Sequence, residues 1–154
     1  MNFAVESRRH ACSQRGYSLI EVLVGCALAG VVMTAAVPTI PPMLASFQLQ
    51  NATFEIANDL RLARERAVTT NGKGRIVFGT TNYQLRRESP VGSGTYVNDG
   101  ASHSLPSNTT ATSNPANPTF DSRGLTSAGY TITVANAYST KTITVSAIGR
   151  VAVN

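Results

Sequence analysis

The sequence predicts an α+β fold in which a long N-terminal helix packs on a C-terminal antiparallel β-sheet. Two observations predict it. Residues 17–70 are first continuously apolar and then helically periodic, whereas residues 74–153 hold short β-branched runs separated by Gly, Pro, Ser and Asn. With 154 residues, the chain is long enough for one modest domain once an N-terminal segment is set aside.

The composition favours a polar, loop-rich β surface outside the cytoplasm. Charged residues make up 14% of the chain, well below the usual quarter, and uncharged Ser, Thr, Asn and Gly replace them, mostly after residue 89. The net charge is +5. That balance does not by itself predict nucleic-acid binding, because scattered arginines usually form a solvated face.

The sequence predicts no enzyme, no cofactor and no metal site. Cys12 and Cys26 both precede the expected sheet, and His10 and His103 lie in the N-terminal segment and in a polar loop. This spacing offers no zinc pattern and no Cys/His nucleophile pair. The string Gly72-Lys73-Gly74 is too short for a phosphate-binding loop. A structural or binding protein is therefore indicated.

Residues 1–16 have the character of a targeting segment, because they are short, basic and without helical periodicity. A secretory signal places its apolar core before the cleavage site, whereas here the apolar run follows Gly16. A cut after Gly16 would leave that run on the mature protein. The positive charges of Arg8, Arg9 and Arg15 favour the cytoplasm, so the C-terminal part is expected across the inner membrane, in the periplasm.

Residues 17–45 are expected to form a single membrane-spanning helix. No charged residue lies between Glu21 and Glu55, and roughly 20 apolar residues span a bilayer core. Gly25 and Gly30 supply small surfaces for close helix contact. The alternative is a buried core helix of a soluble protein, although such helices rarely run this far without a charge.

Residues 46–70 are expected to form an amphipathic second half of the helix. A kink is expected before it, since proline removes a backbone donor and clashes with the preceding turn; the prolines are Pro38, Pro41 and Pro42. Apolar residues recur at spacings of three and four, which predicts one buried stripe: Leu49, Ala52, Ile56, Leu60, Ala63 and Ala67. Glu55 and Asp59 are like-charged and four apart. Thr69-Thr70-Asn71-Gly72 predicts the helix end, with Asn or Gly as a left-handed cap.

Residues 74–153 are expected to form the sheet that covers this stripe. Short runs at 74–79, 82–87 and 95–97 predict its first strands. Residues 98–118 are either a long exposed loop or strands with little core to bury. The runs at 130–134, 141–146 and 148–153 alternate between apolar and polar residues, and they predict an antiparallel meander.

The segment Arg15-Gly16-Tyr17-Ser18-Leu19-Ile20-Glu21, set before this apolar run, resembles the type IV pilin and pseudopilin superfamily. The resemblance implies a pilin-like fold and cleavage between Gly16 and Tyr17 by a prepilin peptidase. The same enzyme then methylates the new amine of Tyr17. Phenylalanine or methionine is more usual at that position. Other pilins or pseudopilins of a filament, and the inner membrane that holds a single-pass anchor, are the further partners implied.

Glu21 becomes the fifth mature residue, the position that the superfamily reserves for glutamate. A carboxylate in an apolar segment needs a positive partner. In a filament, the N-terminal amine of a neighbouring subunit can supply it, which would make Glu21 a device that sets assembly register. The alternative is that Glu21 reaches the cytoplasmic headgroups and has no specific partner.

Several shorter stretches resemble the GspH/FimT group of minor pilins and minor pseudopilins. They are residues 60–68, the strand Arg75-Ile76-Val77-Phe78, Phe120-Asp121-Ser122-Arg123-Gly124 and Ile148-Gly149-Arg150-Val151. The alternative for residues 60–68 is an ordinary amphipathic helix covering its sheet. The group implies a scarce structural subunit that helps initiate or cap a type IV pilus or a type II secretion pseudopilus. The sequence does not separate these two machines.

A competing hypothesis is DNA capture at a pilus tip. Some FimT-like proteins bind DNA through a C-terminal Gly-Arg-x-Arg segment, and here Gly149-Arg150-Val151-Ala152 lacks the second arginine. DNA binding would then require that scattered basic residues converge on one surface. These residues are Arg86, Arg87, Arg123, Lys141 and Arg150.

Overall fold

The computed structural model describes residues 16–36 and 40–154, which fall into two units divided after Thr39. The first unit contains helix α1 (Leu19–Ala36), and every side chain from Leu19 to Thr34 is exposed. Among the described residues, no helix combines the length and the apolar character needed to cross a membrane. The membrane span expected over 17–45 therefore stays a prediction. Pro38, one of the residues expected to break the helix, lies outside the described residues.

Helix α2 (Ile40–Thr69) opens the second unit and starts earlier than the amphipathic pattern alone indicates. Pro41 and Pro42 occupy its first turn, where a missing N–H costs nothing because those amides have no intrahelical partner. The helix ends as expected: Asn71 adopts φ 51°, and the amide of Gly72 donates to the Ala67 carbonyl at 3.1 Å. This left-handed residue closes a Schellman cap.

Within the described residues the strands form two antiparallel sheets, where the sequence pattern indicated one. Sheet A has the order β3-β2-β1-β6, with β4 also paired to β2. Its strands are β1 (Gly74–Phe78), β2 (Asn82–Glu88), β3 (Tyr96–Asn98), β4 (His103–Ser104) and β6 (Thr119–Phe120). Sheet B has the order β5-β7-β8-β9. Its strands are β5 (Thr110–Asn114), β7 (Tyr130–Ala135), β8 (Thr140–Val145) and β9 (Val151–Val153).

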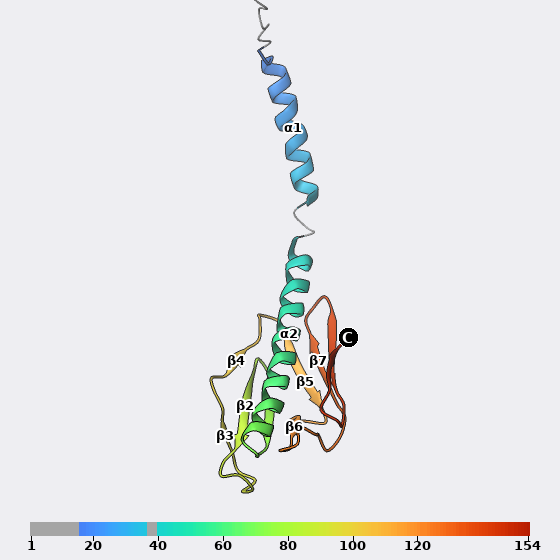
Figure 1. Ribbon diagram of the computed structural model, residues 1–154. Helices are drawn as coiled ribbons and strands as arrows, with labels where there is room; N and C mark the ends of the chain where they lie inside the picture. The colour runs from blue at the N-terminus through green and yellow to red at the C-terminus, as the bar shows by residue number, and fades with distance from the viewer. Residues whose placement is uncertain (1–15, 37–39) are drawn as a thin grey trace, which may run out of the picture. The chain divides into compact units, whose positions relative to one another are not determined.

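Helix α2 lies along both sheets and supplies the centre of the core (Figure 1). All six residues of the expected stripe are buried, with Ile56 and Leu60 fully so. Small residues bring the backbone close: a Cβ on Gly74 of β1 would lie 2.5 Å from the Ala63 carbonyl oxygen. The α+β fold, with a helix packed on antiparallel sheet, is thereby confirmed.

The meander expected at the C-terminus is β7-β8-β9, in which β7 and β8 pair from Tyr130↔Val145 to Ala135↔Thr140. Its inward residues are buried as the alternation predicts: Ile132, Val134, Ile143 and Val145. Residues 98–118 prove to be a mixture of connection and strand. Strand β5 pairs with β7 along its whole length and buries Ala111, so part of this polar stretch belongs to sheet B.

Candidate functional site

Gly16, Tyr17 and Ser18 precede helix α1 without helical structure, and all three are exposed. Ser18 caps the helix. The backbone amide of Glu21 donates to the Ser18 hydroxyl at 3.3 Å and to the Ser18 carbonyl at 3.0 Å. The peptide bond between Gly16 and Tyr17 thus lies in exposed, non-helical chain immediately before a capped helix.

Glu21 lies in the first turn of α1 and is exposed. With Ser18 three residues before it, the pair matches the S-x-x-E pattern of a capping box. A carboxylate here also faces the positive end of the helix dipole, which stabilises it. The bond that forms is the one from the Glu21 amide to the Ser18 hydroxyl, so the Ser-x-x-Glu spacing is a helix-start signal beside the assembly role expected of Glu21.

Three of the motif pieces that carried the resemblance come together in space. Arg64 of α2 donates from Nε to the carbonyl oxygen of Gly124 at 3.1 Å. Gly149 packs against the same point, because a Cβ added there would collide with that carbonyl and lie 2.9 Å from Arg64 Nε. Gly124 and Gly149 have φ of 74° and 76°, which glycine adopts most readily. These segments form one structural joint between α2 and two turns.

Asp121 organises the first of those turns. Its Oδ1 accepts the backbone amides of Arg123 and Leu125, each at 2.9 Å. The backbone amide of Leu125, followed by that of Arg123, holds the pKa of the Asp121 carboxyl below its usual value. Arg123 itself reaches back to the Asp121 carboxylate at 3.3 Å, so its charge is already partly compensated.

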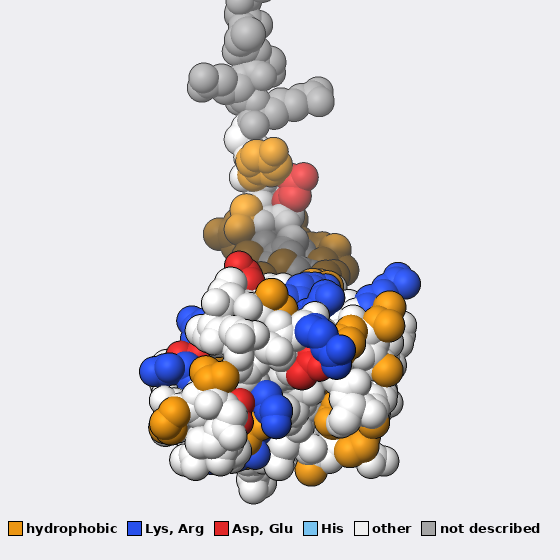
Figure 2. All heavy atoms as spheres, turned by 60° about the horizontal axis from the view of Figure 1, so that its bottom comes forward, with side chains coloured by type: hydrophobic (Ala, Val, Ile, Leu, Met, Phe, Trp, Pro, Cys, Tyr) orange, Lys and Arg blue, Asp and Glu red, His pale blue; other side chains and the backbone are white. Residues whose placement is uncertain are grey.

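The five basic residues considered for DNA contact are spread over β2, β8 and the turns after β6 and before β9. Arg86 and Arg87 are neighbours on β2 and therefore point to opposite faces of sheet A. Lys141 lies near the start of β8, whereas Arg150 follows the turn beyond its end. Arg87 and Arg123 each form an ion pair with an aspartate. On the face in Figure 2, basic side chains stand apart, with acidic and uncharged ones between them.

A tighter basic pair occupies the face of sheet A that points away from α2. Arg75 of β1 is the Cα partner of Arg86 on β2, so the two side chains lie side by side. The guanidinium of Arg75 stacks 3.7 Å from the centre of the Tyr96 ring. Among the described residues, the buried Nε atoms of Arg75 and Arg86 have no hydrogen-bond partner. Of this pair, only Arg86 is among the residues that the sequence suggests for DNA contact.

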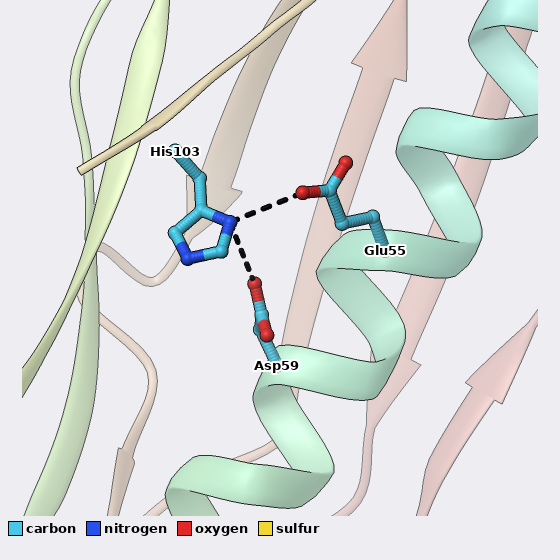
Figure 3. Close-up of side chains that lie close together, drawn as sticks. All are labelled: Glu55, Asp59 and His103. Carbon is cyan, nitrogen blue, oxygen red and sulfur yellow. Dashed lines mark hydrogen bonds and ion pairs between the residues drawn. The ribbon is translucent and has the colours of Figure 1, made fainter. Parts of the chain in front are cut away.

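A second cluster joins α2 to strand β4. His103 Nδ1 lies 3.0 Å from Glu55 Oε1 and 3.6 Å from Asp59 Oδ2, as Figure 3 shows. The Tyr83 hydroxyl donates to Asp59 Oδ2 at 2.6 Å, and its ring stacks on that of His103. Burial raises the pKa of Tyr83, and the hydrogen bond to Asp59 raises it further. The i,i+4 acidic pair was visible in the sequence, but its meeting with His103 was not.

Comparison with known proteins agrees with this architecture. Residues 12–37 match the prokaryotic N-terminal methylation motif. Residues 52–149 match the family of the Type II transport protein GspH. The chain belongs to that GspH family. The resemblance drawn from the sequence is therefore confirmed.

The similarity to an individual curated protein is low and covers only part of the chain. Competence protein ComGD of Bacillus subtilis (strain 168) is 28% identical over 72 residues, which are 47% of this chain and 50% of that protein. The match thus spans about half the length of this curated relative.

Two solved structures share the fold. The type IV minor pilin FimU of Pseudomonas aeruginosa has a TM-score of 0.59 at 17% identity, covering 73% of this chain and 92% of its own. The minor pseudopilin EpsH of the Vibrio cholerae Type 2 Secretion System has a TM-score of 0.58 at 10% identity, with coverages of 70% and 96%.

Proposed function

We propose that this chain is a minor pilin or pseudopilin that helps to initiate or cap a type IV pilus or a type II secretion pseudopilus. One observation carries the proposal: an N-terminal methylation motif stands before a domain of the GspH family in the same chain. Such a domain has its own core and its own sheets, so it can face outward while the N-terminal helix packs among other subunits.

The proposed sequence of events starts at the bond after Gly16. A prepilin peptidase cuts this bond and methylates the amine of Tyr17. The apolar segment holds the chain in the inner membrane, with the domain in the periplasm, until a filament takes it up. Glu21 then pairs with the N-terminal amine of a neighbouring subunit, because a carboxylate without a partner is costly in an apolar surrounding.

Two substitutions of Glu21 separate assembly from helix capping. Glu21→Gln removes the charge but keeps a side chain that fits the capping box, whereas Glu21→Ala removes both. The proposal expects both variants to be processed normally and both to lower filament formation or secretion. Wild-type assembly with Glu21→Gln, or with both variants, would refute the register role of the charge. The number of pili and the amount of secreted substrate, measured in parallel, tell the two machines apart.

A second candidate function is DNA capture at a pilus tip, and one observation favours it. Arg75 and Arg86 lie side by side on neighbouring strands, and the Arg75 guanidinium stacks on the aromatic ring of Tyr96. Two adjacent like charges repel each other, and a phosphate backbone relieves that repulsion. Lys73, Tyr96 and Arg123 also line a cavity on this side of the domain, with a volume of about 410 Å³.

A gel-shift titration with the purified chain tests this candidate. DNA should be retarded at low salt, and retardation should fall as salt rises. Arg75→Gln and Arg86→Gln should each weaken binding, whereas the control Arg61→Gln changes an exposed arginine of α2 that bonds Asn58. No retardation at low salt removes the candidate. An equal loss of DNA binding in all three variants would indicate a general attraction between DNA and the basic protein surface, and would argue against a site at Arg75 and Arg86.

A further inference from the structure

We propose that Glu55, Asp59 and His103 bind one divalent transition-metal ion, for which Zn²⁺ is the matching probe. The three potential ligand atoms are His103 Nδ1, Glu55 Oε1 and Asp59 Oδ2, and all lie within 4.8 Å of one another. Ligand atoms of a tetrahedral zinc ion stand about 3.4 Å apart, given metal–ligand bonds of about 2.1 Å. The distances of 3.0 and 3.6 Å from Nδ1 to the two carboxylates bracket that value.

The donor set decides which class of ion fits. An imidazole nitrogen with two carboxylate oxygens suits Zn²⁺ and similar transition ions. Calcium and magnesium prefer six or more oxygen ligands, which this cluster does not supply. The side chains of Glu55, His103 and Asp59 are 54%, 37% and 13% exposed, so water can complete the coordination from the open side.

The charges around the cluster favour the binding of a cation. Glu55 and Asp59 are four apart on α2 and both face Nδ1, so their like charges converge. Among the described residues, no lysine or arginine pairs with either carboxylate. A single Nδ1–H can bond one of them well at a time, whereas a divalent ion contacts both carboxylates and the imidazole together.

The supporting residues also orient the ligands before any ion arrives. The Tyr83 hydroxyl fixes the Asp59 carboxylate with a 2.6 Å hydrogen bond. The Tyr83 ring stacks on His103 with ring centres 5.2 Å apart, which holds the imidazole in place. Such supporting contacts are what metal sites use to fix ligand direction.

Metal binding would tie strand β4 to helix α2. Strand β4 is only two residues long and pairs with β2 at Asn82↔Ser104 and Tyr83↔His103. The connection that carries it runs from Asp99 to Thr109 and is mostly polar, with Leu105 packed against the core. A ligand that binds only the folded domain raises its melting temperature. The ion would therefore strengthen the edge of sheet A and the attached connection.

The test uses the full-length chain in detergent with both cysteines changed to serine, because thiolates also bind zinc. After chelator treatment, Zn²⁺ is added in a calorimetric titration and Co²⁺ is followed by its visible absorption. The site variants are Glu55→Gln and His103→Asn. Glu65→Gln is the matched control, since it removes an equal charge from an exposed position on the same helix.

The proposal expects one ion per chain, tetrahedral Co²⁺ bands and a rise in melting temperature with Zn²⁺. Both site variants should weaken binding by at least about tenfold, and Glu65→Gln should leave it unchanged. Zinc binding that is absent, or equal in the parent and in Glu55→Gln, overturns the site. Because Glu55 is exposed, that variant keeps the core intact and carries the test even if His103→Asn fails to fold.

Discussion

The Nε of Arg64 donates a hydrogen bond to the carbonyl oxygen of Gly124, 60 residues further along the chain. Gly149 packs on the same carbonyl, so helix α2, the turn after β6 and the turn before β9 meet at one point. The glycine of the incomplete Gly-Arg-x-Arg segment thus has a structural reason to be glycine. Its presence needs no nucleic acid to explain it.

Gly149→Ala should destabilise the domain strongly, and Gly92→Ala is its matched control. Both positions have positive φ, but only Gly149 has backbone where a Cβ would stand. The φ strain costs about 1–2 kcal/mol at either site. The collision should cost Gly149→Ala about 1–3 kcal/mol more. Urea denaturation followed by circular dichroism measures the difference in the free energy of unfolding. Equal losses in the two variants would show that the contact between Gly149 and Gly124 adjusts to a Cβ without loss of stability.

Leu60→Ala should lower the free energy of unfolding by about 2–5 kcal/mol, because it leaves a cavity at the centre of the core. Leu60 has 0% exposure and lies on the stripe of α2 that faces the sheets. Leu44→Ala on the same helix is the control, since Leu44 is 56% exposed. Its cost should stay within about 0.5 kcal/mol. Similar costs at both positions would contradict the assignment of the buried face.

Asp121→Asn should lower stability at neutral pH, and this loss should disappear in acid. The folded state depresses the pKa of Asp121 below 3.8, so the ionised carboxylate contributes stability above that value and loses it as pH falls further. Parent and variant should therefore converge as the pH drops through the folded-state pKa. Unfolding curves between neutral and acid pH measure this, and a constant gap across the range would assign the effect to packing instead.

Local patterns predicted the helices and the meander well. The stripe from Leu49 to Ala67 is buried as its spacing indicates, and Asn71 caps α2 where the Thr-Thr-Asn-Gly string ends it. Both features depend on residues a few positions apart, where helix geometry fixes which side chains share a face. The N-cap that Ser18 forms for α1 is equally local and could be predicted from the sequence.

Contacts between residues far apart in the chain could not be predicted from the sequence. The choice between one sheet and two depends on which strands pair, and β5 pairs with β7 from within a stretch of Ser, Thr and Asn that carries little apolar signal. The meeting of Glu55 with His103 depends on the register of β4 against β2. The joint of Arg64 with Gly124 depends on the packing of α2 on the sheets.

Mass spectrometry of purified filaments tests the central proposal most directly. A scarce filament subunit should be found in them at a low ratio to the main subunit, with an N-terminal peptide that begins at N-methylated Tyr17. A Gly16→Ala variant should remain unprocessed and absent from filaments. The proposal is contradicted if the protein is missing from filaments that form normally, or if the incorporated chain still carries residues 1–16.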